Sequence, residues 1–313
     1  MSTFSTCTSS TRPGSSANPT PPGDGDVLFE TDTKNVIIWD GTNWRGYASD
    51  VISLSSITNT YSLDLDGTNE HLTAGSETLF NTNYPFSFSG WVKLDTYANT
   101  YPVLVNLKTD IGGFIIFFNQ SANNYYGVSI GFDGATNGSG TPRLTTNSTA
   151  IASDLLGNWR HICLTFDGVD ISAGGNGTSG VQDTTSGFKL YINNSLKTLY
   201  TSGSTGTQGN INVFGNSANI NYLDGHIDEF SIYNTELSAN QVSELYNSGV
   251  AGVDANPFNP VGWWRMGDAS GDSWDGTNWT IDNVASGTNS LGSNADATSV
   301  NMEQADRTAD VAS

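Results

Sequence analysis

The chain has 313 residues, with 31 acidic and 11 basic side chains and a formal net charge of −20. Nucleic acids and anionic membrane surfaces bind clustered lysine and arginine, so this balance argues against both as partners. Two cysteines, Cys7 and Cys163, exclude a disulfide-rich scaffold, and 35 glycines among abundant Asn, Ser and Thr predict an all-β protein of short strands joined by turns.

The start of the chain shows no targeting signal. Residues 1–20 have no apolar run of the kind a signal peptide requires. No apolar stretch approaches the ~20 residues of a membrane-spanning helix. We therefore expect a protein made in a cytoplasm, without a signal peptide and without membrane insertion.

Residues 1–50 read as two segments. Residues 1–25 are rich in Ser, Thr, Pro and Gly and predict a flexible arm. Residues 26–50 predict a small β-meander, with two short strands around a turn at 32–35 and an Asp40-Gly41 turn before a third strand at Trp44. A meander of this size buries too little apolar surface to be stable by itself, so we interpret it as a docking module.

A series of strand patterns follows from residue 61. The run of Phe and Ile at 114–118 indicates a strand covered on both sides. The other predicted strands lie at 61–67, 86–94, 125–132, 159–166, 189–192 and 211–215. Long polar loops at 133–142, 168–187 and 201–210 separate them, and loops of that length usually bind something or line an interface.

Residues 222–249 contain the last strong strand and the one short helix that the sequence predicts. Residues 226–233 alternate between two faces, as a strand does. Ser238 and Gln241 then form a capping-box pattern, and Gly249 stands at the position of a C-terminal cap.

The stretch Asp-Gly-His-Ile-Asp-Glu-Phe-Ser-Ile-Tyr at 224–233, with the helix after it, resembles the last sheet strand and trailing helix of laminin-G-like, concanavalin A-like jelly rolls. The stretches at 61–67, 86–94, 158–168 and 188–194 agree with that family in order. The resemblance implies a jelly-roll sandwich over residues 58–302, including added strands near 261–268 and 297–302. Residues 303–313 are then expected to form a tail.

Residues 25–47 resemble small modules of tailed-bacteriophage virion proteins, particularly tail fibres and head-surface proteins. This second resemblance implies a location in the virion and other capsid or tail proteins as partners. Because virion components occupy symmetric sites, we also expect a homo-oligomer.

Glycoside hydrolysis needs two carboxylates about 5 to 10 Å apart. Glycosidases of the jelly-roll family carry Glu-x-Asp-x-x-Glu, or a version one residue longer, on one strand, and no Glu of this chain has that spacing. The histidines His71, His161 and His226 have no zinc-binding spacing, and His161 matches a structural position of the family's core strand. The sequence therefore predicts a protein that is not an enzyme.

Calcium is the cofactor that the jelly-roll resemblance implies, because many members hold it with Asp and Asn side chains. Asp64 and Asp66 in the first sandwich strand, and Asp224 and Asp228 near the last, are the candidate ligands, since those strands are often neighbours. The alternative, which turn chemistry favours, is that Asp66-Gly67 and Asp224-Gly225 simply form turns.

Carbohydrate binding would use aromatic platforms beside hydrogen-bonding loops. Tyr125, Tyr126 and Tyr222 adjoin Asn-rich segments and are the candidates, although the same residues suit ordinary sandwich packing. The leading hypothesis is a structural protein of a phage virion surface, as head decoration or tail fibre. The alternative is a lectin that recognises host-surface glycans, and a glycoside hydrolase is the third hypothesis.

Overall fold

The computed structural model describes most of the chain, and it divides into two compact units, Met1–Ser53 and Leu54–Ser313. The described residues are 5–11, 13–14, 26–30, 36–39, 42, 44–47, 54–75, 85–97, 101–109, 112–119, 127–134, 141–168, 182, 187–205, 211–215, 221–288 and 290–313.

In the described residues of the N-terminal unit, a four-stranded sheet has the order β1 (Ser5–Cys7), β2 (Val27–Glu30), β3 (Val36–Trp39) and β4 (Trp44–Tyr47). The three predicted strands pair as an antiparallel meander. The expectation of a flexible arm over residues 1–25 is wrong in part, because Ser5–Cys7 pairs in parallel with β2 and a 3-10 turn, η1 (Ser9–Thr11), follows it. Composition did not indicate this, since a three-residue strand depends on the sheet edge that it joins.

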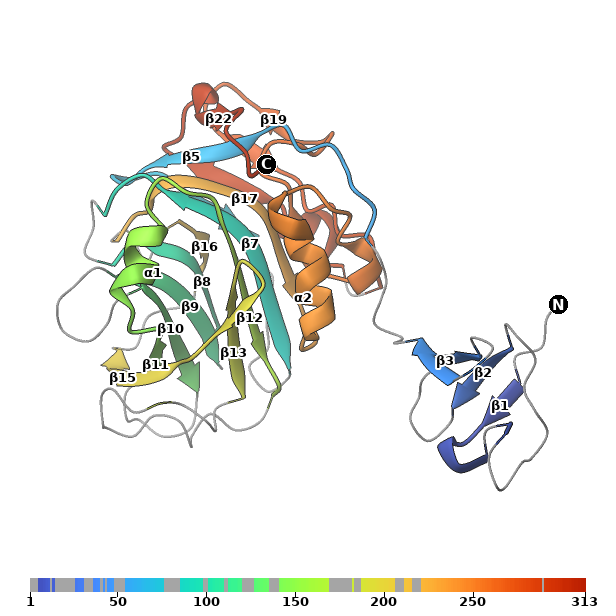
Figure 1. Ribbon diagram of the computed structural model, residues 1–313. Helices are drawn as coiled ribbons and strands as arrows, with labels where there is room; N and C mark the ends of the chain where they lie inside the picture. The colour runs from blue at the N-terminus through green and yellow to red at the C-terminus, as the bar shows by residue number, and fades with distance from the viewer. Residues whose placement is uncertain are drawn as a thin grey trace. The chain divides into compact units, whose positions relative to one another are not determined.

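The second unit is a sandwich of two antiparallel sheets (Figure 1), which confirms the predicted all-β jelly-roll architecture. Among the described residues, the larger sheet has ten strands in the order β15 (Tyr200–Thr205), β11 (Thr141–Thr145), β10 (Gly127–Gly134), β9 (Gly112–Asn119), β8 (Val103–Thr109), β16 (Ile211–Phe214), β6 (His71–Ala74), β21 (Ala297–Val300), β20 (Trp279–Ile281) and β19 (Ser273–Trp274).

The other sheet has eight strands within the same described ranges. Their order is β14 (Ser195–Lys197), β13 (Phe188–Ile192), β12 (Arg160–Phe166), β7 (Phe86–Leu94), β17 (Asp224–Tyr233), β5 (Ser62–Asp66) and β22 (Arg307–Thr308), with β18 (Gly262–Trp264) paired to β17. The central position of β17, between β7 and β5, explains why its pattern is so pronounced in the sequence: every residue after Asp224 is buried.

The core lies between the two sheets and is rich in aromatic side chains. Phe86 and Phe88 of β7 face it, whereas Trp91 of the same strand lies on the outer face, where its ring stacks on Tyr246. This is the period-2 alternation expected of a strand. Trp264 of β18 is fully buried in the same core.

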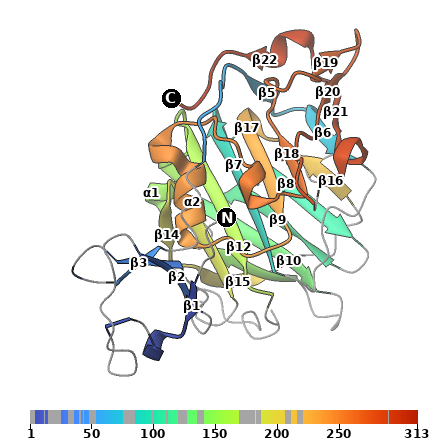
Figure 2. The same ribbon diagram turned by 90° about the vertical axis from the view of Figure 1, so that its right-hand side faces the viewer.

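The helix α2 (Ala239–Tyr246) packs on the outer face of the eight-stranded sheet, near β7 and β12 (Figure 2). Its predicted capping box is present: Ser238 Oγ accepts the backbone N–H of Gln241, and Gln241 Oε1 accepts that of Ser238. The expectation of a single helix is wrong, because α1 (Thr149–Asp154) follows an N-cap at Ser148. Six residues are too few to show a helical period.

Four 3-10 turns lie in the C-terminal part: η3 (Asn247–Gly249), η4 (Asn256–Phe258), η5 (Gly292–Ala295) and η6 (Gln304–Asp306). None of the helices in the described residues is long and apolar enough to span a membrane.

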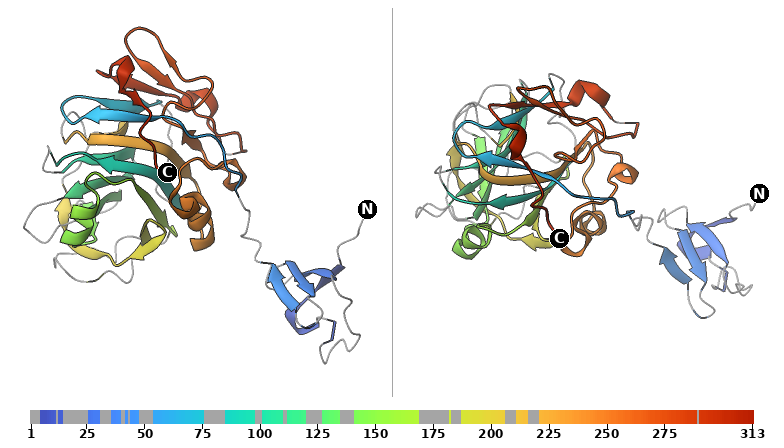
Figure 3. Two further views of the ribbon diagram at one scale, coloured as in Figure 1. Left: turned by 45° about the horizontal axis from the view of Figure 1, so that its top comes forward. Right: turned by 90° about the horizontal axis from the view of Figure 1, so that it is seen from above.

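The C-terminal segment, residues 303–313, is part of the sandwich, so the expectation of a separate tail is wrong (Figure 3). Its strand β22 pairs with β5, and Arg307 stacks on the Tyr61 ring with its guanidinium carbon 3.9 Å from the ring centroid. Ala312 is buried, and its carbonyl accepts the N–H of Ala251. The acidic, small-residue composition hid this packing, because a short strand, one stacked arginine and one buried alanine suffice to hold the segment.

Candidate functional site

The first and last strong strands of the sandwich are neighbours, as expected. In the antiparallel pairing of β5 with β17, Asp66 lies opposite Asp224, and Asp64 lies opposite His226. On the other side of β17, His226 lies opposite Lys93 of β7. Three adjacent strands therefore bring acidic side chains and His226 to one end of the sheet, which we call the acidic edge.

Two of the four calcium candidates serve local structure at this edge. Asp66 Oδ1 accepts the backbone N–H groups of Thr68 at 2.7 Å and Asn69 at 3.1 Å, which is a turn closed by its own side chain. Gly67 has a positive φ of 69°, and a Cβ there would lie 2.6 Å from Cβ of Asp224. Asp224 itself accepts a hydrogen bond from the Thr96 hydroxyl. The turn interpretation therefore accounts for the Asp66-Gly67 pair.

Asp228 lies elsewhere, buried beside a β-bulge. The register between β17 and β7 shifts after Asp228, and Glu229 has a positive φ of 49°. Asp228 Oδ2 accepts a hydrogen bond from Asn59 Nδ2 at 2.8 Å, and Asp228 is fully buried. Burial and the adjacent Glu229 carboxylate raise the pKa of Asp228 well above its ordinary value. Asp228 is thus a structural group, apart from the acidic edge.

Glu229 is held in a charged network next to that bulge. Its two carboxylate oxygens accept hydrogen bonds from Trp263 Nε1 at 2.7 Å and Arg265 Nε at 3.0 Å. Burial raises the pKa of Glu229 to about 7, against the opposing effect of the Arg265 charge. The network ties β17 to β18 and to the residue after it, Arg265.

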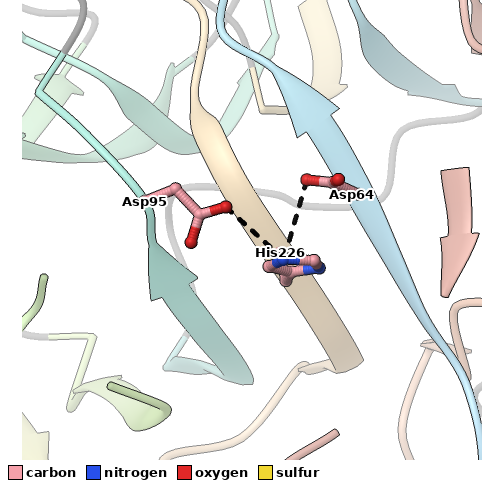
Figure 4. Close-up of side chains that lie close together, drawn as sticks. All are labelled: Asp64, Asp95 and His226. Atoms are coloured by element: carbon pink, nitrogen blue, oxygen red, sulfur yellow. Dashed lines mark ion pairs between the residues drawn. The ribbon is translucent and has the colours of Figure 1, made fainter. Parts of the chain in front are cut away.

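The side chains that meet at the acidic edge are Asp64, Asp95 and His226 (Figure 4). His226 Nε2 lies 3.5 Å from Asp95 Oδ2 and 3.8 Å from Asp64 Oδ1, and one ligand atom of each residue falls within 4.8 Å of the others. The backbone N–H of Asp95 donates to the carbonyl of Asp224 at 3.0 Å, which fixes Asp95 beside β17. Sequence patterns indicated Asp64 as a candidate ligand but did not indicate Asp95 or His226.

The C-terminal segment also contacts this cluster. Asp310 Oδ2 lies 3.9 Å from His226 Nε2 and forms an ion pair with Lys93, while its other oxygen accepts from Trp159 Nε1 at 2.8 Å. Burial alone would raise the pKa of Asp310, but the hydrogen bonds from Lys93 and Trp159 outweigh it and lower that pKa. For Asp64 burial prevails over nearby His226 and raises the pKa.

A second carboxyl pair adjoins the edge. Glu70 Oε2 accepts the backbone N–H of Asp66 at 2.8 Å, and Glu70 also hydrogen-bonds to Asp306 of η6. Glu70 is 7% exposed. Burial first, and then the neighbouring carboxylates of Asp306 and Asp66, raise the pKa of Glu70 to about 8. At neutral pH one proton is therefore shared between Glu70 and Asp306.

The carbohydrate-binding candidates are only partly within the described residues. Tyr125 and Tyr126 lie outside them, as does most of the three long loops. Tyr222 is half-buried, and its ring centroid lies 6.0 Å from that of His71. Carbohydrate binding at these tyrosines stays a prediction.

His161 occupies a structural position. It is buried in β12, and its Nε2 lies 2.7 Å from Ser89 Oγ of β7. Burial lowers the pKa of His161 to about 3, so the ring is neutral at physiological pH. A buried neutral imidazole that links two strands fits the packing role expected from the sequence.

Solved structures similar to this chain have low sequence identity. A putative carbohydrate binding protein from Bacteroides ovatus is 12% identical with a TM-score of 0.49, and the match covers 78% of this chain and 58% of that one. A heptameric SAP-like pentraxin from Limulus polyphemus is 12% identical with a TM-score of 0.37, covering 61% and 84%. Domain 4 of the arabinanase AbnA from Geobacillus stearothermophilus, in complex with arabinotriose, is 19% identical with a TM-score of 0.39, covering 61% and 82%. At these scores the structures carry no argument about function.

No curated protein matches the chain. The family model Laminin_G_3, described as the concanavalin A-like lectin/glucanases superfamily, matches residues 66–243. These residues include β17, the strand pattern at 224–233 and the capping box of α2, and they make up more than half of the sequence. The chain therefore belongs to the Laminin_G_3 family of concanavalin A-like lectin and glucanase domains.

Proposed function

We propose that the protein is a non-enzymatic structural component of a tailed-bacteriophage virion surface, either a head decoration or part of a tail fibre. The observation that carries the proposal is the division of the chain at residues 53 and 54, with the phage-like stretch 25–47 inside the small N-terminal unit. In this proposal the small unit docks to other virion proteins and the Laminin_G_3 sandwich is displayed. The net charge of −20 suits a displayed, well-solvated surface.

The roles of the buried carboxylates support a non-enzymatic sandwich. Glu229 accepts hydrogen bonds from Trp263 and Arg265, and Glu70 accepts the N–H of Asp66 and bonds to Asp306. A glycosidase needs one carboxylic acid and one carboxylate directed at the sugar. Groups held in internal networks of this kind serve the fold.

Mass spectrometry of purified particles tests the proposal. We expect this chain to copurify with the major capsid protein through a density gradient and a high-salt wash, while a phage-encoded replication enzyme serves as the control that is removed. Absence of the chain from washed particles, with the chain present in the infected-cell lysate, would refute the virion assignment. Cryo-electron microscopy of the particles then separates a head position from a tail position and gives the number of copies at each symmetric site.

Glycan binding is the second candidate, and membership of the lectin and glucanase superfamily favours it. A glycan array probed with the full chain tests it. The variant Tyr222→Ala should reduce a specific signal, whereas Leu196→Ala, at a side chain that is 58% exposed on β14, should leave it unchanged. Loss of the signal with EDTA would support a calcium-dependent lectin. An array without any specific signal would favour display of the sandwich without glycan recognition.

A further inference from the structure

The hydroxyl groups next to His226 determine which nitrogen of its ring carries the proton. Ser62 Oγ donates to the carbonyl oxygen of Asp310 at 2.5 Å, and a hydroxyl has one hydrogen to donate. In the 3.2 Å contact between Ser62 Oγ and Thr308 Oγ1, Thr308 must therefore be the donor. Thr308 Oγ1 then accepts in its 3.4 Å contact with Nδ1 of His226, so Nδ1 is the protonated nitrogen.

The other ring nitrogen of His226 consequently faces acceptors. Nε2 lies 3.5 Å from Asp95 Oδ2 and 3.8 Å from Asp64 Oδ1, and His226 is only 7% exposed. With Nδ1 protonated, a neutral ring directs the Nε2 lone pair at carboxylate oxygens, which is repulsive unless a cation lies between them. A proton on Nε2 or a bound metal ion would each supply that cation, and titration of the chain with metal ions separates the two.

We propose that Asp64, Asp95 and His226 form a binding site for a divalent transition-metal ion, with Zn²⁺ as the best match. Zinc takes imidazole nitrogen and carboxylate oxygen at about 2.0–2.2 Å, so neighbouring ligand atoms in a tetrahedral site lie roughly 3.3–3.5 Å apart. The pairs at 3.5 and 3.8 Å approach that spacing. Calcium prefers an all-oxygen set of six to eight ligands, so the histidine selects against it.

The surroundings match what a metal-binding histidine requires. A ligating histidine usually donates its second N–H to a fixed acceptor that orients the ring, and Thr308 Oγ1 holds that position here. Asp310 Oδ2, 3.9 Å from Nε2 and paired with Lys93, is close enough to supply a fourth ligand by a small shift. The ion would join β5, β17 and the end of β7 next to the C-terminal segment, and so stabilise the sandwich by mass action. This site is independent of the virion proposal.

Titration of the full chain, stripped of metal by chelation, with ZnCl₂ and CoCl₂ tests the site. We expect one equivalent to bind by calorimetry, the visible absorption of tetrahedral Co²⁺, and a thermal midpoint that rises with Zn²⁺ concentration but not with equal CaCl₂. His226→Gln and Asp95→Asn should each weaken Zn²⁺ binding at least 10-fold. Thr308→Val, which removes the acceptor for Nδ1–H, should weaken it by about 10- to 100-fold.

The matched control is Asp224→Asn. It removes one negative charge from the same edge, opposite Asp66, without removing a proposed ligand. Unchanged Zn²⁺ affinity in this control, with loss in Asp95→Asn, supports the site. Equal loss in both variants would mean attraction to the acidic surface alone, and absence of saturable Zn²⁺ binding would mean that a proton on His226 balances the carboxylates. Either result overturns the proposal. Should His226→Gln fail to fold, Asp95→Asn decides the question, because Asp95 is exposed at the sheet end.

Discussion

Replacing Glu70 by Gln should make the sandwich more stable at alkaline pH and remove part of its pH dependence. Glu70 shares a proton with Asp306, and the pKa of Glu70 is raised to about 8, first by burial and then by the carboxylates of Asp306 and Asp66. In Glu70→Gln the amide oxygen still accepts the N–H of Asp66, and the amide nitrogen still donates to Asp306. The variant therefore keeps the hydrogen bonds of the protonated state at every pH.

The magnitude follows from linkage. The folded protein binds this proton more tightly than the unfolded chain, whose Glu pKa is about 4.3, so the stability it contributes is complete below about pH 4.3 and is lost as pH rises through about 8. Each pH unit in that window changes the free energy of unfolding by about 1.4 kcal/mol, so the total change is at most about 5 kcal/mol. Asp306 is half-buried, and solvent screens its interaction with Glu70. We therefore expect about half of that maximum change.

Urea unfolding at each pH unit from 5 to 9 measures this effect. The difference in free energy of unfolding, Glu70→Gln minus wild type, should grow by about 2–3 kcal/mol between pH 5 and pH 8. The control is Glu244→Gln, whose Oε2 likewise accepts a backbone N–H, from Leu54 at 3.3 Å. It reports what a Glu-to-Gln change does at a hydrogen-bonded Glu outside the Glu70–Asp306 pair. Parallel stability curves for Glu70→Gln and wild type would show that Glu70 is ionised in the folded protein and that the reasoning is wrong.

Substitutions at three further positions test the packing, again by urea unfolding. Trp264→Ala empties a fully buried position in the sandwich core and should cost about 3–5 kcal/mol; a cost below 1 kcal/mol would contradict its central place. Ser238→Ala removes the hydroxyl that accepts the N–H of Gln241 and should cost about 1 kcal/mol, with Ser238→Asp largely restoring it. Asp228→Asn should be neutral or stabilising at pH 7, because the new amide can donate to the unpartnered Oδ1 of Asn59, whereas Asp228→Ala should cost about 1–3 kcal/mol. A loss in Asp228→Asn as large as in Asp228→Ala would show that the negative charge is required.

The sandwich could be predicted where local pattern and tertiary burial agree. The pattern at 226–233 located β17 as a strand, but the predicted strict alternation is wrong across the bulge after Asp228, because Ile227 before it and Phe230 and Ile232 after it all lie in the core. The capping box located α2 because Ser238 and Gln241 satisfy each other's backbone groups. The parts that were missed depend on distant partners. Ser5–Cys7 is a strand only against β2, and residues 303–313 are ordered by contacts with β5 and Ala251.

The candidate site was predicted only to the level of strands. The expected adjacency of β5 and β17 correctly placed Asp64 beside the last strong strand, where it lies opposite His226. Sequence spacing could not find Asp95 or His226 as its partners, because each comes from a different strand and the three are far apart along the chain. The same expectation of neighbouring first and last strands also named Asp228, which instead faces Asn59 in a buried position.

The acidic edge brings several carboxylates close together, and they have different hydrogen-bond or charge partners. Asp66 accepts the backbone N–H groups of its own turn, Glu70 keeps a proton that it shares with Asp306, and Asp310 is paired with Lys93. Asp95 lies 3.9 Å from Lys93 Nζ, and both Asp64 and Asp95 face Nε2 of His226, whose Nδ1 contacts the Thr308 hydroxyl. A bound divalent cation would compensate both carboxylates at once, and it would use the ring orientation that the C-terminal segment already imposes.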